Sequence, residues 1–292
     1  MLENSVFCKL IVIDQLPCLH IQHPKFFAEI CLQGAQLTQF IPAGKNPLIW
    51  LSPTAQYHKH QGLRGGIPIC WPWFGALEKN PDSIKQQIQS SDLAHGFVRT
   101  MDWHLTQYSE SAHQVDLTLS LKHSADTLKI WPFEFQLNCH FSLSKDLSLK
   151  LETQNLSKQS MHFSQALHSY FPINDIHRTR ILGAEKQIYI DALDQWNEKQ
   201  QQSVIAIKEE VDRLYFGKSD YQILTPTQLI RVCSNSKSSV IWNPWVNKSK
   251  RLSQFSPVDY QSMLCIESAN VLHDSVCLPA KQNHTLSLNI SS

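Results

Sequence analysis

The run Leu63–Gly75 combines residue types that suit a rigid pocket for an anion. It places Arg64 directly before Gly65 and Gly66, and prolines and aromatic rings follow, namely Pro68, Trp71, Pro72, Trp73 and Phe74. Arginine offers a fork of donors that matches phosphate or carboxylate, and glycine lets the backbone approach a ligand closely. The run therefore predicts an aromatic-walled pocket with one fixed cation. A buried aromatic corner with a salt-bridged arginine fits its composition equally well.

Two further residues have the chemistry of a general acid–base pair. Glu267 lies in the mostly apolar stretch Ser262–Asn270, and burial there would raise its carboxyl pKa toward the pH at which a base works best. His168 lies in Ala166–Phe171, where strand alternation places it on the same face as Tyr170. Its imidazole is expected to titrate near neutral pH. The plainer alternatives are an outward-facing strand glutamate and a satisfied core histidine.

Alternating hydrophobic residues indicate that strands position these side chains. Val115–Leu121 and Phe133–Leu143 alternate apolar and polar residues, and Leu147–Leu151 follows after a short turn, which predicts a hairpin. Leu286–Ile290 gives a last alternating strand. Strands and helices do not alternate along the chain, so a parallel sheet is not expected. The pattern predicts an all-β sandwich of antiparallel strands forming one domain over residues 1–292.

The remaining segments carry weaker signals. Short helices are expected within Asp82–Ser90 and Pro257–Met263, and the polar insert Asn197–Ser203 is expected to be a hairpin loop. Pro244 predicts a bend rather than a mid-strand position. Tryptophans in β-sandwiches usually lie in the core, so none of four is assigned individually to a ligand: Trp71, Trp73, Trp242 and Trp245.

Composition limits the classes of function. The 292 residues carry a formal net charge of +1, which provides no basic field for nucleic acid or anionic membranes. The start of the chain, Met1–Ser5, lacks the basic residues of a signal peptide, and no apolar run approaches membrane-spanning length, so a soluble cytoplasmic protein is expected. Eight scattered cysteines are predicted to be reduced and largely buried. Fourteen histidines lack metal-ligand spacing, so no metal is expected.

Seven motifs together resemble one known family. In order, they are Leu32–Leu37, Arg64–Gly75, His95–Arg99, Ala166–Phe171, Val211–Tyr215, Trp242–Trp245 and Cys265–Asn270. Their sequences and order are similar to those of the hexose-6-phosphate mutarotases, also called glucose-6-phosphate 1-epimerases, a branch of the aldose 1-epimerase superfamily. The resemblance covers nearly the whole chain, from about Phe27 to Val276.

This resemblance implies both a fold and a reaction. The fold is the galactose-mutarotase-like supersandwich, with its sugar site on the concave face of the larger sheet. The reaction interconverts the α and β anomers of hexose 6-phosphates without metal or cofactor, and a monomer is expected. Glu267 would be the base that takes the proton of the anomeric hydroxyl, and His168 the acid that protonates the ring oxygen. The ring then opens, turns about C1–C2 and recloses on the other face.

The resemblance assigns two more residues to sugar hydroxyls. His95 matches a second family histidine that contacts the sugar, and its alternative is a loop histidine that caps the turn before Gly96. Asp212 matches the family aspartate that grips hydroxyls. Its alternative is a surface ion pair with Arg213, which would contribute little.

Two arginines distinguish this branch from mutarotases of free sugars. Arg64 and Arg99 match the family residues that hold the 6-phosphate, and paired guanidinium groups suit a dianion. For Arg99 the alternative is a salt bridge to Asp92 or Asp102. One position departs from the pattern: Ala94 stands where some members have a glutamine that donates to the phosphate.

The sequence leaves three other functions open. An aldose 1-epimerase of free sugars would use the same acid–base pair, but two unpaired arginines have no purpose beside a neutral sugar. A non-catalytic sugar-phosphate-binding module would not need both His168 and Glu267. A metal-dependent isomerase of the cupin type would need metal ligands that the spacing does not provide.

Overall fold

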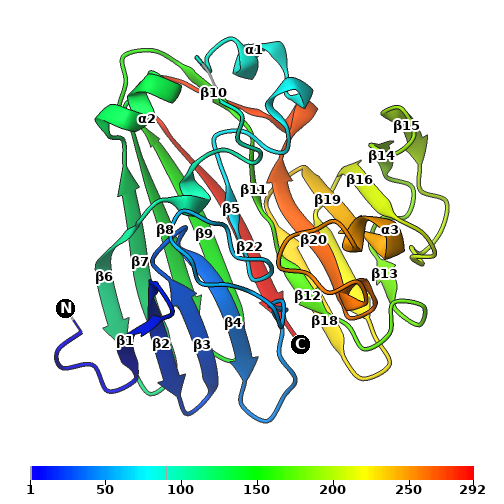
Figure 1. Ribbon diagram of the computed structural model, residues 1–292, viewed down its shortest axis with the longest axis horizontal. Coiled ribbons are helices and arrows are strands. Elements are labelled where there is room, and N and C mark those ends of the chain that lie inside the picture. The colour runs from blue at the N-terminus through cyan, green and yellow to red at the C-terminus, as the bar shows by residue number, and fades with distance from the viewer. Residues whose placement is uncertain (1, 90) are drawn as a thin grey trace.

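The computed structural model describes residues 2–89 and 91–292, and antiparallel strands account for most of its regular secondary structure (Figure 1). The first sheet, called the N-terminal sheet, has the order β1-β2-β3-β4. Its strands are β1 (Cys8–Ile13), β2 (Leu16–His23), β3 (Phe26–Cys31) and β4 (Gln36–Pro42). The all-β fold predicted from alternation is therefore confirmed.

A second sheet, called the long sheet, has the order β13-β17-β18-β22-β9-β8-β7-β6. It contains the predicted hairpin, paired in register from Phe135 opposite Asn155 to Leu143 opposite Leu147. Its strands are β6 (His104–Glu110), β7 (Val115–Lys122), β8 (Phe135–Leu143), β9 (Leu147–Asn155), β13 (Arg180–Leu182), β17 (Asp220–Leu224), β18 (Leu229–Ser234) and β22 (Asn283–Ser291).

A third sheet, called the site sheet, has the order β15-β14-β16-β19-β20-β11-β5, and β12 also pairs with β20. Its strands β16, β19 and β20 are yellow to orange in Figure 1. Its strands are β5 (Ile69–Cys70), β11 (Gln165–Leu167), β12 (Tyr170–Pro172), β14 (Ile188–Asp191), β15 (Asn197–Gln200), β16 (Val211–Phe216), β19 (Ser238–Asn243) and β20 (Met263–Asn270). The two large sheets have eight strands each, so the expected distinction of a larger sheet does not apply.

Short elements join the sheets. A two-stranded ladder links β10 (Met161–Phe163) and β21 (Val276–Leu278). The helices are α1 (Asp82–Lys85), α2 (Ala125–Ile130), α3 (Trp245–Ser249) and the 3-10 turns η1 (Leu77–Lys79), η2 (Val98–Thr100), η3 (Asp259–Gln261) and η4 (Leu272–Asp274). Both expected helical segments are thus present but shorter than drawn from sequence, and Ser90 lies outside the described residues. Pro244 ends β19 and begins α3, as the predicted bend requires.

The polar insert was wrongly expected to be a loop. Asn197–Gln200 forms the edge strand β15, paired with β14 from Asp191 opposite Asn197 to Ile188 opposite Gln200. An edge strand has one side free for solvent, so it tolerates polar residues that a central strand would not. Periodicity alone misses such a strand because neither of its faces needs to be apolar.

One apolar core joins the sheets. Residues from all three contribute to it, including Phe26 and Phe40 from the N-terminal sheet and Phe141 from the long sheet. Trp71 and Trp73 are completely buried in this core, and Trp71 packs edge-on against Trp131 with ring centroids 4.9 Å apart. The two tryptophans therefore belong to the core rather than to a pocket wall, which agrees with the alternative of a buried aromatic corner for this part of the Leu63–Gly75 run.

The two glycines of that run serve chain packing. Gly65 has φ +105°, and a Cβ atom there would lie 2.7 Å from Trp50 O. Gly66 has φ +70°, and its Cβ would lie 2.4 Å from Leu37 O. Both contacts are impossible for any other residue. The glycines therefore let the chain beside Arg64 pack closely against the segments of Trp50 and Leu37, and they do not serve to bring a ligand close to the backbone.

Candidate active site

The register of the site sheet brings the predicted acid and base together. β20 pairs with β11 at Ser268 opposite Leu167 and with β12 at Cys265 opposite Tyr170. The same register continued across the gap sets His168 opposite Glu267. Directly opposite residues of antiparallel strands project from one face, and His168 Nε2 lies 3.4 Å from Glu267 Oε1.

The same geometry assembles the rest of the face in two rows. Asp212 on β16 is opposite Trp242 on β19, and Trp242 is opposite Cys265, the partner of Tyr170. In the next row Leu214 is opposite Val240, which is opposite Glu267. Side chains two residues apart on a strand share a face, so both rows line one side of the sheet. A cavity of about 450 Å³ lies over them.

The acid–base pair is buried and incompletely hydrogen-bonded. Glu267 is 1% exposed, and neither its Oε2 nor Nδ1 of His168 has a hydrogen-bond partner in the protein. Buried polar atoms are normally paired because an unpaired one costs about 1–3 kcal/mol. Both residues line the cavity, so a polar ligand there could satisfy them. The alternative of an outward-facing strand glutamate is wrong.

Burial moves the two pKa values in opposite directions. Desolvation raises the pKa of Glu267 well above its usual value, and the nearby Asp212 charge adds to the rise. Desolvation also lowers the pKa of His168, helped by His95, Arg64 and Arg99. The expected near-neutral pKa of His168 is therefore wrong for the free protein, because both burial and positive neighbours oppose its imidazolium.

His95 is a neutral hydrogen-bond donor to the cavity. Burial lowers its pKa to about 3, and the Arg99 and Arg64 charges add to the effect. Its Nδ1 accepts a hydrogen bond from the Gly75 backbone N–H at 3.2 Å, so the ring proton is on Nε2. The residue has φ +64°, and its ring lies 5.7 Å from that of His168. It lines the cavity rather than merely capping a turn.

Arg64 and Arg99 line a smaller cavity of about 390 Å³ next to the acid–base pair. Of the arginines within residues 2–89 and 91–292, only Arg213 has an ion-pair partner, so the alternative salt bridge of Arg99 to Asp92 or Asp102 is not formed. Arg64 donates from Nε to the Ser253 carbonyl and from Nη1 to the Tyr170 hydroxyl, both at 3.4 Å.

Uncharged groups complete this cavity, namely Gln56, Gln61, Gly62, Ser253 and Gln254. Two unpaired guanidinium groups with amide neighbours favour an anion. The side chains of Gln61 and Gln254 were not singled out from sequence, since they lie in polar loops without a pattern. Ala94 lines the larger cavity instead.

Asp212 faces the cavity and its neighbour Arg213 faces away. Lys248 lies 3.8 Å from Asp212, whereas Arg213 pairs with Asp191 at the same distance. The alternative of an ion pair between Asp212 and Arg213 is wrong, because neighbouring strand residues point to opposite faces. Burial raises the pKa of Asp212 to about 6, although Lys248 opposes the rise.

Aromatic rings wall the cavity, but not the ones at the centre of the Leu63–Gly75 run. Phe74, Tyr170, Trp196 and Trp242 line it. Trp196 lies in the β14–β15 turn with Lys79 over its ring, 5.5 Å from the centroid. Sequence reasoning did not single out Trp196. Its only signal is a large aromatic residue inside a polar segment, which is where sugar-binding rings can be presented.

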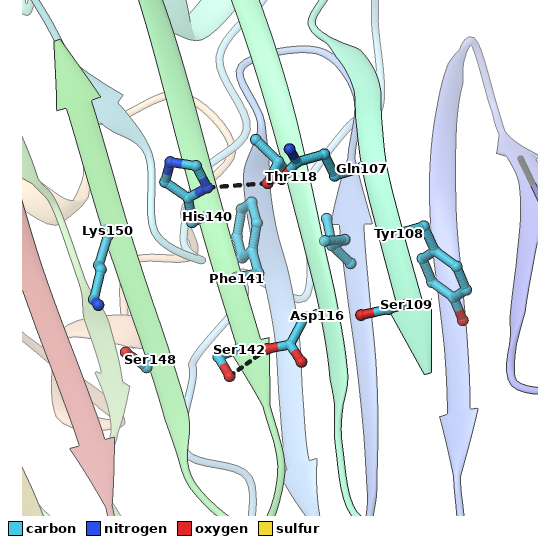
Figure 2. Close-up of a pocket in the computed structure, with 11 residues that line it drawn as sticks. Gln107, Tyr108, Ser109, Asp116, Thr118, His140, Phe141, Ser142, Ser148 and Lys150 are labelled. Carbon is cyan, nitrogen blue, oxygen red and sulfur yellow. Dashed lines mark hydrogen bonds between the residues drawn. The ribbon is translucent and has the colours of Figure 1, made fainter. Parts of the chain in front are cut away.

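A cavity of about 690 Å³ on the outer face of the long sheet has a different character (Figure 2). Its polar side chains mostly satisfy one another: Thr118 contacts His140 at 3.0 Å, and Ser142 donates to Asp116 at 2.6 Å. The acid–base pair and the arginines lie elsewhere. This cavity therefore offers neither unpaired buried groups nor a cation pair, and the chemistry points to the site sheet.

The sequence matches a family model described as aldose 1-epimerase over residues 17–291. The chain belongs to the aldose 1-epimerase family. A relative from Escherichia coli K12, named "Putative glucose-6-phosphate 1-epimerase", is 30% identical over 262 residues, covering 88% of this chain and 84% of the relative. The family membership expected from the seven motifs is thereby confirmed.

Solved structures of this family agree with the fold. A Salmonella typhimurium structure described as a putative mutarotase has a TM-score of 0.89 at 27% identity, covering 99% of this chain and 94% of that one. Galactose 1-epimerase from Lactobacillus acidophilus NCFM has a TM-score of 0.75 at 12% identity, with 98% of each chain covered. The expected galactose-mutarotase-like fold is confirmed.

Predictions from the sequence also concern metal-ligating clusters, membrane-spanning helices and cysteines. No cluster of three or more His, Cys, Asp or Glu side chains within residues 2–89 and 91–292 is arranged to hold a metal ion. No described helix is long and apolar enough to cross a membrane. All eight cysteines are free, and Cys233 and Cys277 are the two that are not buried, which agrees with the predicted reduced and largely buried state.

Proposed function

We propose that this epimerase interconverts the α and β anomers of hexose 6-phosphates. One observation carries the choice of substrate: Arg64 and Arg99 lie unpaired in a cavity that shares His168 and His95 with the sugar cavity. Leaving two guanidinium groups without a counter-charge costs stability unless the ligand is an anion. The similarity to a relative named for glucose 6-phosphate supports the same substrate class.

The reaction needs only two positioned proton-transfer groups. In its ionised form Glu267 takes the proton of the anomeric hydroxyl, while protonated His168 gives one to the ring oxygen, and the C1–O5 bond breaks to give the open-chain aldehyde. The two substrate oxygens are bonded to the same carbon, so acid and base must be neighbours, as the 3.4 Å contact provides. Rotation about C1–C2 and reversal of both transfers close the other anomer.

The remaining groups orient the sugar between these two. His95 donates from Nε2, since its Nδ1 is occupied by Gly75. Asp212 accepts from hydroxyls at the other end of the cavity, and Trp242 and Trp196 provide flat faces. The sugar is then held by the arginines through its phosphate and by Asp212 through its hydroxyls. The distance between these two contacts fixes which ring atoms meet the acid–base pair.

Two other functions use the same site differently. A free-sugar epimerase would leave the arginine cavity empty, and a binding module would have no use for the close acid–base contact of His168 and Glu267. Both are less consistent with the site than a phosphorylated substrate that is turned over. The free cysteines fit a reducing compartment, and we propose a cytoplasmic, monomeric enzyme.

Magnetisation-transfer NMR of anomer exchange tests the proposal, with glucose 6-phosphate and glucose as parallel substrates at neutral pH. Faster exchange of the phosphate ester alone is the expected result. Arg99→Gln should raise KM for the ester by about tenfold to a hundredfold, the loss of one charge-assisted contact. Arg231→Gln, an exposed arginine on the long sheet, is the matched control. Equal acceleration of both sugars would overturn the substrate assignment.

A further inference from the structure

A chain of direct contacts links the proposed phosphate site to the catalytic histidine. Arg64 Nη1 meets the Tyr170 hydroxyl at 3.4 Å. The Tyr170 ring stacks on His168 with centroids 4.8 Å apart and planes within 9°. Trp50 stacks behind Tyr170 at 5.8 Å and 20°. The rings of His168, Tyr170 and Trp50 form one stack, which holds the Arg64 guanidinium group and the His168 imidazole at a fixed separation.

His168 shares its cavities with several titratable and charged side chains. The titratable and charged groups that face it are Glu267 on β20, Tyr170 on β12, His95 before η2, and the two arginines. Burial disfavours the imidazolium most, and His95, Arg64 and Arg99 add to the effect. Within residues 2–89 and 91–292, the acidic side chain in ion-pair range of His168 is Glu267, whose own charged form is opposed by burial.

We propose that the substrate's phosphate group activates the acid–base pair as well as anchoring the sugar, because its charge neutralises Arg64 and Arg99 and favours proton transfer from Glu267 to His168 across their 3.4 Å contact. The proton leaves Glu267 Oε1 and joins His168 Nε2, so the step forms a carboxylate base and an imidazolium acid together and no other bond changes. Tyr170 is a positioning residue in this scheme, since its hydroxyl holds Arg64 beside the stacked rings. The inference rests on the proposed function.

A mere anchor and an activator differ in a measurable way. An anchor improves binding, which changes KM, whereas an activator lowers the barrier to the chemical step, which changes kcat. An activator should also work when it is not bonded to the sugar. The arginine cavity and the sugar cavity adjoin, so a free dianion and a sugar without a phosphate arm can occupy them side by side.

The first test uses D-xylose, which lacks the phosphorylated arm, together with phosphite dianion. Mutarotation of fresh α-D-xylose is followed by polarimetry with the full-length protein, with and without phosphite at concentrations that inhibit glucose 6-phosphate exchange. Phosphite should accelerate xylose turnover about tenfold or more, the effect of one pKa unit at the pair. Chloride at equal ionic strength is the control. Unchanged or slower xylose turnover while phosphite competes with glucose 6-phosphate would overturn the inference.

The second test uses the full substrate, so it does not depend on phosphite binding. Tyr170→Phe keeps the stacked ring and removes the hydroxyl that meets Arg64. It should lower kcat for glucose 6-phosphate about three- to tenfold, the loss of one hydrogen bond, and shift the pH profile of kcat. Tyr221→Phe removes another buried hydroxyl, bonded to Ser239 and remote from both cavities, and is the matched control. A change in KM alone would overturn the inference.

The two proposals fail separately. If glucose 6-phosphate exchange is not accelerated by the unmodified protein, the proposed function is wrong. If exchange is accelerated but phosphite gives no activation and Tyr170→Phe keeps its kcat, the phosphate is only an anchor and the proposed function stands.

Discussion

Replacing Glu267 by glutamine should remove activity and increase stability at once. The amide has the shape of the carboxyl group, so the sugar cavity keeps its volume, but it cannot accept the anomeric proton. A positioned base contributes about 10²–10⁴-fold, which corresponds to about 3–5 kcal/mol in the barrier at 1.36 kcal/mol per factor of ten. We expect kcat for hexose 6-phosphate exchange to decrease by about 10²–10⁴-fold, with KM nearly unchanged.

The stability effect follows from the direction of the Glu267 pKa. Burial raises this pKa in the folded protein above its unfolded value. The folded state therefore binds the proton more tightly, and its advantage is complete at acidic pH and is lost as the pH rises through the folded-state pKa. Glutamine does not titrate, so Glu267→Gln should be more stable than the native protein at pH 8, and the difference should shrink toward pH 4.

Glu29→Gln is the opposite control. Glu29 is also buried, but its Oε1 accepts hydrogen bonds from Thr38 at 2.7 Å and Tyr57 at 2.8 Å. Glutamine keeps an acceptor oxygen but removes the charge, so these bonds should weaken, which should cost about 1 kcal/mol and leave activity intact. Urea denaturation at pH 4, 6 and 8 and NMR exchange measure both variants. An active Glu267→Gln, or one less stable than the native protein at pH 8, would refute the reasoning.

Four further predictions follow from other residues. His95→Asn should reduce acid sensitivity in urea titrations, because the low His95 pKa of about 3 costs the native protein stability as the pH falls from 6.5 toward 3, by at most about 5 kcal/mol. Asp212→Asn should raise KM about tenfold and remove a fall in kcat/KM below pH 6, where the native carboxylate becomes protonated. Trp196→Ala should raise KM about five- to tenfold with kcat retained in NMR exchange, the loss of about 1 kcal/mol of ring contact. Ser124→Ala, which removes the capping box of α2, should lower unfolding free energy by about 1 kcal/mol without changing activity.

Local patterns predicted the strands well where one face is apolar. The hairpin of β8 and β9 was readable because each strand buries alternate residues in the core. The edge strand β15 was not, because its side chains are mostly exposed and carry no alternation. The break between β11 and β12 was also missed. The apolar alternation runs without interruption through Leu167–Phe171, but His168 and Ser169 belong to neither strand.

Residue types were easier to assign than their environments. A glutamate in an apolar stretch predicted the raised pKa of Glu267, since burial was visible from its neighbours. The lowered pKa of His168 was not predicted, because its main cause is burial in the folded protein, and His95, Arg64 and Arg99 from distant segments add to it. For the Leu63–Gly75 run the sequence left a pocket wall and a buried aromatic corner open, and only packing showed that Trp71 and Trp73 lie in the core.

The sequence by itself determined the family, the all-β class and the identity of the six candidate site residues, because motifs and alternation are properties of the chain: Arg64, His95, Arg99, His168, Asp212 and Glu267. Only the tertiary structure decided which of their neighbours matter. The cross-strand register sets His168 beside Glu267, leaves Arg64 and Arg99 unpaired, and recruits Tyr170 and Trp196. Distances between segments far apart in the chain depend on that register, and no local pattern encodes them.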